Sequence, residues 1–157
     1  MGNRIFAYGF ALMIFVADQV TKAIVRGTVA RGGSEQVLPF VDLVNTRNTG
    51  VAFGLLDGAG WIVTAVTLVA LAALLVFFAF NHDRRFAWVP TGLLVGGAVG
   101  NMIDRFGGNG VTDFVKLPAW PAFNVADVCI TAGVVALVLV LEQPREQRRG
   151  RALAADG

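Results

Sequence analysis

The chain of 157 residues is 55% hydrophobic and only 15% charged, with a formal net charge of +2. This composition is too apolar for a soluble domain of that length and indicates a membrane protein. The basic C-terminal run "PREQRRGR" has no interleaved aromatic residues, so it predicts a membrane-flanking tail and no nucleic-acid partner.

Four segments are long and apolar enough to cross a bilayer, which takes about 20 helical residues. They are residues 5–25, 61–80, 88–106 and 123–141. The first is predicted to be a retained helix and not a signal peptide, because its apolar stretch is long and no small-residue cleavage site follows it. The predicted fold class is therefore an all-α polytopic membrane protein with four transmembrane helices in a single domain, residues 1–157.

The two segments on the other side of the predicted bundle from the termini are not helical in character. Residues 26–60 contain a turn-rich stretch followed by β-branched and aromatic residues, which predicts a small extracytoplasmic β-rich element. Pro39 in this segment favours an edge position. Glycines and prolines in residues 107–122 preclude a continuous helix.

The distribution of basic residues predicts the orientation. Four spans place both termini on one side, together with the short loop "NHDRR" and the tail at residues 142–157. Positive charge concentrated in short loops and tails marks the cytoplasmic side. The other side of the membrane then holds residues 26–60 and 107–122.

Charged and amide side chains inside the spans gather at one depth, toward the outer ends. They are spaced three or four residues apart and so share helix faces. This polar group comprises Asp18 and Lys22, then Asn101, Asp104 and Arg105, then Asn124 and Asp127, with Asp113 in the loop before the last span.

A structural explanation exists for each member of this group. Asp18 and Lys22 would form a snorkelling ion pair. Asn124 would cap the fourth helix, whose dipole favours Asp127 in its first turn. The same arrangement on three helices and a loop nevertheless favours a functional site, because each charge in the membrane needs its own compensation.

Elimination limits the chemistry available to such a site. The single histidine, His82, is predicted on the cytoplasmic side, out of reach of Ser34 and Cys129. Zinc lacks its usual ligands. A carboxylate site for Mg²⁺ or Ca²⁺ stays open as an alternative, although no loop has the usual spacing. A pair of carboxyl groups that share one proton remains, and it requires no metal and no cofactor.

Five motifs in order resemble those of lipoprotein signal peptidase (signal peptidase II), a family of bacterial intramembrane aspartic proteases. They are "DQVTK" at 18–22, "NTGVAFG" at 48–54, "GGAVGNMIDR" at 96–105, "VTDF" at 111–114 and "FNVAD" at 123–127. The resemblance covers essentially the whole chain. It departs from the family in a fairly short loop between the two aspartates and in the valine after "FNVAD".

The resemblance implies that the catalytic residues are Asp113 and Asp127. Supporting and substrate-binding positions carry over to Asp18, Lys22, Asn48, Gly97, Asn101, Asp104, Arg105 and Asn124. Phe53 is a hypothetical lid residue over the site. The implied substrate is a prolipoprotein whose cysteine carries diacylglycerol, cut just before that cysteine at the outer face of the cytoplasmic membrane.

The expected partners are therefore lipid-modified prolipoproteins and membrane lipids, and the expected state is a monomer. Two other functions compete with the protease. An ion-coupled transporter would use the carboxylates as a relay, although the inner halves of the spans lack charges. A non-catalytic assembly subunit would use the glycine-rich third span as a packing face.

Overall fold

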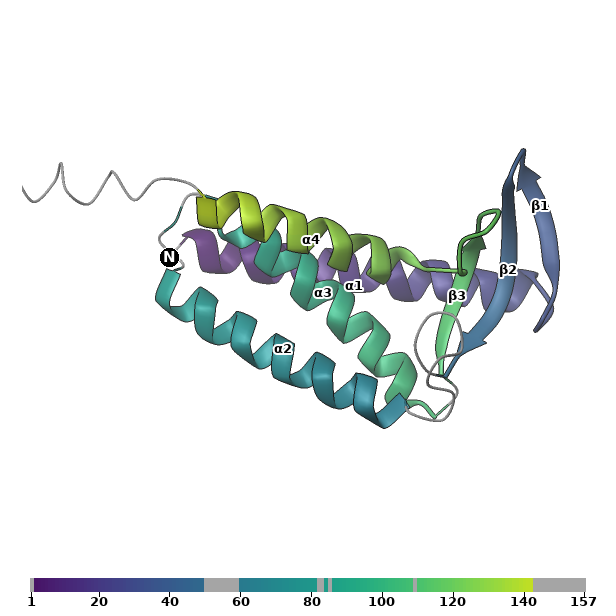
Figure 1. Cartoon of the computed structure of the whole chain (residues 1–157), viewed down its shortest axis with the longest axis horizontal. Coiled ribbons are helices and arrows are strands. Elements are labelled where there is room, and N and C mark those ends of the chain that lie inside the picture. The colour runs from purple at the N-terminus through teal and green to yellow at the C-terminus, as the bar shows by residue number, and fades with distance from the viewer. Residues whose placement is uncertain (1, 50–59, 82–83, 85, 109, 143–157) are drawn as a thin grey trace, which may run out of the picture.

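The computed structural model describes residues 2–49, 60–81, 84, 86–108 and 110–142, and within them four helices and a three-stranded antiparallel sheet. The helices run side by side along the long axis of the molecule, and the sheet lies at one end of them (Figure 1). In chain order the elements are α1 (Gly2–Thr28), β1 (Ser34–Leu38), β2 (Val41–Asn48), α2 (Gly60–Asn81), α3 (Trp88–Phe106), β3 (Val111–Lys116) and α4 (Val125–Glu142).

The predicted spans agree with these helices to within three residues at each end. Within the described residues, α1, α2 and α4 are long and apolar enough to cross a membrane. Helix α3 matches residues 88–106, but it is not among these three, because it carries Asp104 and Arg105 near its end. A fourth span therefore stays a prediction.

Helix α1 has one buried stripe on an otherwise exposed apolar surface. Its buried positions recur every three, four or seven residues, which places them on one face. They are Ala7, Ile14, Asp18, Lys22 and Val25. Such exposure of apolar side chains suits lipid as the solvent, and the buried stripe faces α3, the helix in contact with all the others.

Close backbone approach between helices depends on glycines of α3. A Cβ atom added at Gly96 would lie 2.6 Å from the Ala11 carbonyl oxygen of α1. One added at Gly97 would lie 2.7 Å from the Ala126 carbonyl oxygen of α4. Small residues at such positions are the usual means by which membrane helices pack closely.

We expect Gly96→Ala to lower the free energy of unfolding by about 1 to 3 kcal/mol, because a backbone oxygen cannot move aside without shifting a helix. The measurement is titration of the purified protein with a denaturing detergent in mixed micelles. Gly9→Ala on α1 is the matched control, since no neighbouring atom of the described residues lies within 4 Å of an added Cβ there. A loss no larger than that of the control would contradict this account of the packing.

The sheet packs on the end of the bundle through β3. Its strand order is β1-β2-β3, and β2 and β3 pair so that Thr46 lies opposite Asp113. Phe114 of β3 is buried against Val25 of α1 and against Val29, the residue that follows α1. Strand β3 is thus fixed by β2 on one side and by packing on the helices on the other.

Two features of the sheet differ from the sequence predictions. Asp113 was expected in a loop, but it lies within β3, where pairing with β2 supplies backbone partners that are not visible locally. Pro39 is in the turn between β1 and β2 and not in an edge strand. Phe53, His82, most of the "NTGVAFG" motif and the tail after residue 142 lie outside the described residues.

Candidate active site

Asp113 is buried on β3, with an exposed fraction of 3%. Its two carboxylate oxygens each accept a hydrogen bond from an amide. Asn124 Nδ2 donates to Oδ1 at 2.7 Å, and Asn48 Nδ2 of β2 donates to Oδ2 at 3.0 Å. The carboxylate is therefore held from two elements, and its position depends on the docking of the sheet.

Asp127 lies in the first turn of α4, where the helix dipole favours a negative charge. It forms a reciprocal cap with Asn124, the residue before the helix. Asn124 Oδ1 accepts the Asp127 backbone N–H at 3.0 Å, and Asp127 Oδ2 accepts the Asn124 backbone N–H at 3.1 Å. Asn101 Nδ2 of α3 donates to the other oxygen, Oδ1, at 2.8 Å. The capping role expected for Asn124 and Asp127 thus coexists with a place in the site.

Asn124 joins the two carboxylates. Its side-chain amide donates to Asp113, and its backbone N–H donates to Asp127. Asn124 is 1% exposed; its hydrogen bond to Asp113 is buried, and its hydrogen bond to Asp127 is partly buried. The structure therefore brings the two aspartates of the sequence prediction onto one shared residue, from a strand and a helix.

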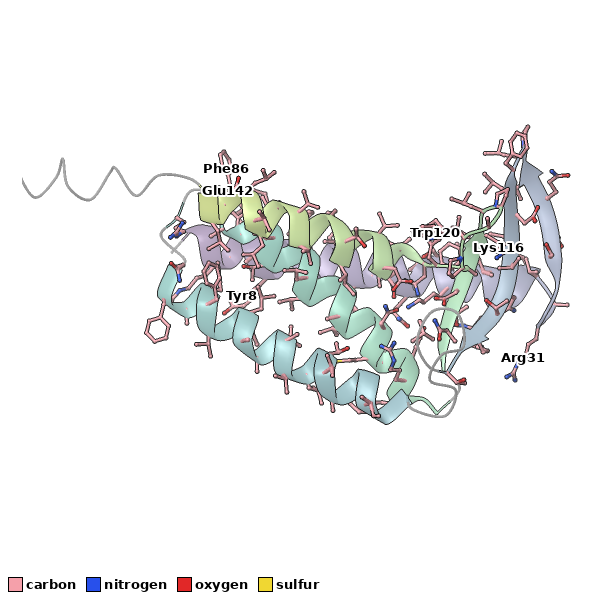
Figure 2. The ribbon with its side chains drawn as sticks, viewed as in Figure 1. Tyr8, Arg31, Phe86, Lys116, Trp120 and Glu142 are labelled. Carbon is pink, nitrogen blue, oxygen red and sulfur yellow. The ribbon has the colours of Figure 1, made fainter. Side chains whose placement is uncertain are left out.

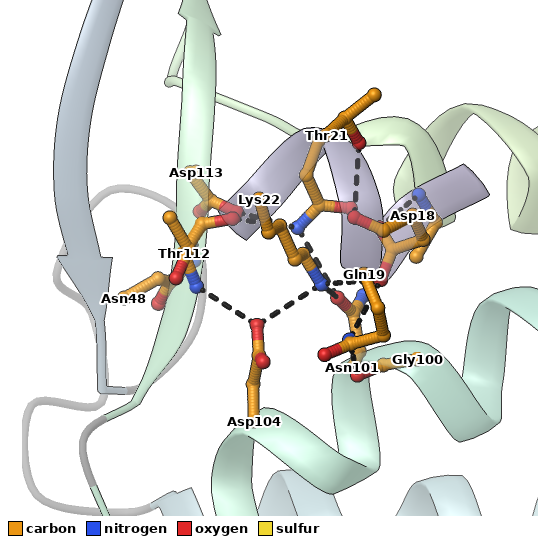
Figure 3. A network of polar contacts seen from close by, with 12 residues as sticks. Asp18, Gln19, Thr21, Lys22, Asn48, Gly100, Asn101, Asp104, Thr112 and Asp113 are labelled. Atoms are coloured by element: carbon orange, nitrogen blue, oxygen red, sulfur yellow. Dashed lines mark hydrogen bonds and ion pairs between the residues drawn. The ribbon is translucent and has the colours of Figure 1, made fainter. Parts of the chain in front are cut away.

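Lys22, Asp18 and Asp104 form a buried ionic cluster in contact with the Asn101 amide (Figure 3). The Lys22 ammonium is 2.8 Å from Asp18 Oδ2 and 3.1 Å from Asp104 Oδ2, and the side chains of Lys22 and Asp18 are 0% exposed. Lys22 also donates to Asn101 Oδ1 at 2.9 Å. This cluster is thus no snorkelling pair, because its charge stays inside the protein.

The same contacts fix the orientation of the Asn101 amide. Its oxygen accepts from Lys22 and, at 3.1 Å, from Asn124 Nδ2. Only the amino group of Asn101 is then available to face Asp127. Lys22 therefore acts on Asp127 through Asn101.

Asp18 connects α1 to the start of α4. Its Oδ1 accepts the Ala126 backbone N–H at 3.0 Å, which is one of the unpaired donors at that helix end. Gly100 gives the carboxylate room, since a Cβ there would lie 2.5 Å from Asp18 Oδ2. Gln19 donates to Asp18 at 3.2 Å and to the Gly100 carbonyl at 3.1 Å.

Thr112 is a site residue that the sequence analysis missed. It is 0% exposed, and its backbone N–H donates to Asp104 Oδ2 at 3.2 Å. Its hydroxyl accepts hydrogen bonds from the guanidinium groups of Arg26, at 3.1 Å, and Arg47. Asp104 therefore braces β3 next to Asp113. The sequence analysis predicted a loop where the structure has strand β3, and it therefore assigned no role to Thr112.

Gly97 and Arg105 are the predicted site positions that remain among the described residues. Gly97 packs against the α4 backbone and allows the helix carrying Asp127 to approach α3. Arg105 is partly buried, and the charges of Asp104, Asp113 and Asp127 act on it. Within the part of the chain that the structure describes, however, no carboxylate lies within ion-pair distance of its guanidinium.

The electrostatic environment of Asp113 favours its protonated form. Burial, and to a lesser degree the negative charge of Asp127, raise the pKa of Asp113 to about 6. The hydrogen bonds from Asn48 and Asn124 and the charge of Lys22 act in the opposite direction. Asp113 thus holds a proton at a pH where ordinary carboxyl groups are ionised.

A pair of carboxyl groups in this setting can exchange protons with a substrate and a water molecule. Among the described residues, no group of three or more His, Cys, Asp or Glu side chains is arranged to hold a metal ion. The side-chain donors to Asp113 and Asp127 are the amides of Asn48, Asn101 and Asn124. This donor set suits proton transfer.

The sequence matches a protein family described as signal peptidase (SPase) II over residues 10–142. A lipoprotein signal peptidase of Symbiobacterium thermophilum is 41% identical over 138 residues, which cover 83% of this chain and 90% of that protein. The lipoprotein signal peptidase of Rhodopseudomonas palustris is 40% identical over 141 residues, covering 81% of this chain and 85% of that one.

Solved structures have a similar fold. One, described as a bacterial membrane enzyme structure by the in meso method at 2.3 Å resolution, matches with a TM-score of 0.79 and 33% identity. The match covers 90% of each chain. A second structure, similarly described at 1.9 Å resolution, matches with a TM-score of 0.77 and 34% identity over 87% of this chain and 92% of that chain.

Proposed function

Because the chain belongs to the signal peptidase II family, we propose that Asp113 and Asp127 are the catalytic pair of a membrane aspartic endopeptidase. The chain is a bacterial membrane protein, and it cleaves the signal peptides of lipoproteins. The observation that supports the proposed chemistry is the hydrogen bonding of both carboxylates to one buried residue, Asn124. Family membership disfavours the transporter and the assembly subunit.

The environment of Asp113 supports a division of roles within the proposed pair. Asp113 holds the shared proton, because burial and the neighbouring charge make its ionisation unfavourable. Asp127 accepts hydrogen bonds from the Asn101 amide and the Asn124 backbone N–H, and it lies in the first turn of α4, where the helix dipole favours a negative charge. Asp127 therefore acts as the general base and Asp113 as the general acid in the first step.

The first step adds water to the scissile carbonyl. Asp127 takes a proton from the water while the water oxygen forms a bond to the carbonyl carbon. Asp113 donates its proton to the carbonyl oxygen. Asp127 then gives its proton to the leaving nitrogen as the C–N bond breaks, and Asp113 takes a proton back from the diol. The products are a carboxyl group on the signal peptide and a free amine on the lipoprotein.

Arg105 is proposed to bind the substrate backbone. It lies partly buried in the field of three carboxylates, without an ion pair to any described carboxylate. A guanidinium has five donors and no acceptor, so it suits peptide carbonyl groups. Phe53 as a lid stays a hypothesis from the sequence.

The proposed substrate carries diacylglycerol on the cysteine after the cut, and the sheet end of the bundle is proposed to face the outer side of the cytoplasmic membrane. The test uses the purified protein in phospholipid vesicles with a precursor in two forms, with and without diacylglycerol. We expect a new N-terminus at the lipidated cysteine, identified by mass spectrometry. Equal cleavage of the unmodified precursor would contradict the proposed substrate.

The pH profile is expected to depend on Asn48. The pair is active with Asp113 protonated, so kcat/KM should fall as the pH rises through about 6, the raised pKa of Asp113. Because the hydrogen bond from Asn48 lowers the pKa of Asp113, Asn48→Ala should move this alkaline limb to higher pH.

Thr46→Val is the matched control on the same strand, since Thr46 donates to the backbone oxygen of Asp113 and not to its carboxylate. Rates on vesicle-bound precursor across the pH range give both profiles. A limb that moves to lower pH in Asn48→Ala, or moves equally in the control, would contradict the assignment of the proton to Asp113.

A further inference from the structure

One end of the sheet is apolar and exposed. Leu38 and Phe40 are 61% and 77% exposed, and Trp120 is 60% exposed. The strand register brings them to the same end, because Leu38 pairs with Val41 and Asp42 pairs with Lys116, the last residue of β3. The turn between β1 and β2 and the loop after β3 therefore form one apolar edge, defined here as residues 38–41 and 117–122.

The backbone at this edge holds apolar side chains in unfavourable conformations. Phe40 has φ 66° and Ala119 has φ 57°. This left-handed region favours glycine or asparagine, and a bulky residue there is uncommon. A glycine at position 40 would relieve the strain and remove an exposed aromatic ring, so the needs of a turn in water do not explain Phe40.

The apolar edge is continuous with the lipid-facing surface of α4. The loop returns to β3 at Phe123, which bridges to Val115, and α4 begins two residues later. Lys116 donates to the Trp120 carbonyl at 2.6 Å, and Figure 2 shows both residues near the end of β3. Helix α4 itself exposes Val128, Val135 and other apolar side chains along its length.

The side chains at this edge are those that a membrane interface favours. Tryptophan is enriched at the level of the lipid headgroups. A lysine keeps its charge in that layer while its carbon chain covers apolar surface. Residues at the opposite end of the first strand differ, since Arg31 lies there and is exposed (Figure 2).

We propose that the apolar edge is seated in the lipid headgroup layer on the sheet side of the membrane. The sheet is then anchored to the bilayer at a point away from the helices. Because β3 carries Asp113 and α4 carries Asp127, contact of the edge with the headgroup layer holds the two carboxylates at the same depth relative to the membrane surface. Anchoring of the edge in the headgroup layer does not depend on the proposed chemistry of the pair.

The test measures the depth of position 40 in a bilayer. The full chain with Cys129→Ser receives a nitroxide label at Phe40→Cys, Arg31→Cys or Val135→Cys. Each protein is placed in vesicles of phosphatidylethanolamine and phosphatidylglycerol. We expect the ratio of chelate collisions to oxygen collisions at position 40 to lie between the high ratio at position 31, which is exposed to water, and the low ratio at position 135, inside the bilayer.

A second measurement uses the native Trp120, in case the cysteine at position 40 disturbs the turn. In a variant with Trp61→Phe and Trp88→Phe, lipids brominated near the headgroup should quench the fluorescence several-fold more than lipids brominated at the chain end. Chelate access at position 40 equal to that at position 31, with Trp120 unquenched by either lipid, would overturn the proposal. Dipolar coupling between labels at position 40 would assign the edge to a second copy of the chain instead, and would also overturn it.

Discussion

Asp113→Asn and Asp127→Asn should each lower the single-turnover rate of precursor cleavage by a factor of at least about 10³, since each carboxyl is proposed to transfer a proton in both steps. An asparagine has nearly the same shape but cannot give or take that proton. The two effects should not add, because the aspartates act as one unit. The measurement is cleavage of a lipidated precursor in vesicles.

Both variants should still fold and insert. An asparagine keeps one acceptor for the amides around it, so we expect a loss of stability of only about 1 to 2 kcal/mol. Asp42→Asn is the matched control, because Asp42 lies on β2 opposite Lys116, away from the pair. The control should cleave at the normal rate. Retained cleavage in either single variant at the pair would refute the assignment.

Lys22→Met should cause the largest loss of stability, about 3 to 5 kcal/mol, because it leaves carboxylates buried without their cation. Lys22 is 2.8 Å from Asp18 and 3.1 Å from Asp104. Methionine fills a similar volume, so the loss reports the charge and not a cavity. The free energy of unfolding in mixed micelles is the measurement.

Arg26→Met is the matched control one turn further along α1. Arg26 is 31% exposed and lies 3.8 Å from Asp104, so its removal should cost no more than about 1 kcal/mol. The cost at Lys22 should fall when Asp18→Asn is added, because one unpaired charge is then absent. If Lys22→Met proves as mild as the control, the buried cluster does not stabilise the fold.

The sequence predicted the parts of the site that repeat along helices. Asp18 and Lys22 share a helix face at a spacing of four, and Asn124 and Asp127 have the spacing of a helix cap. These local patterns located the end of the bundle where the site lies. The resemblance carried by the order of the motifs then implied that Asp113 and Asp127 form a pair, and the structure brings both into contact with Asn124.

The contacts between distant segments could not be predicted in this way. Asn48 reaches Asp113 across 65 residues, through pairing of β2 with β3. That pairing also made Asp113 part of a strand, although glycines and prolines flank its segment. Thr112 was overlooked for the same reason, since its partners come from α1, α3 and β2.

The reciprocal cap between Asn124 and Asp127 has a consequence for inhibitors directed at this pair. A bacterium escapes a drug by substitutions that spoil its binding and spare the target. Here Asp127 starts a membrane helix, and Asn124 holds both carboxylates. A substitution at either residue would therefore disturb the start of α4 and the position of both carboxylates, so we expect resistance to arise outside the proposed pair.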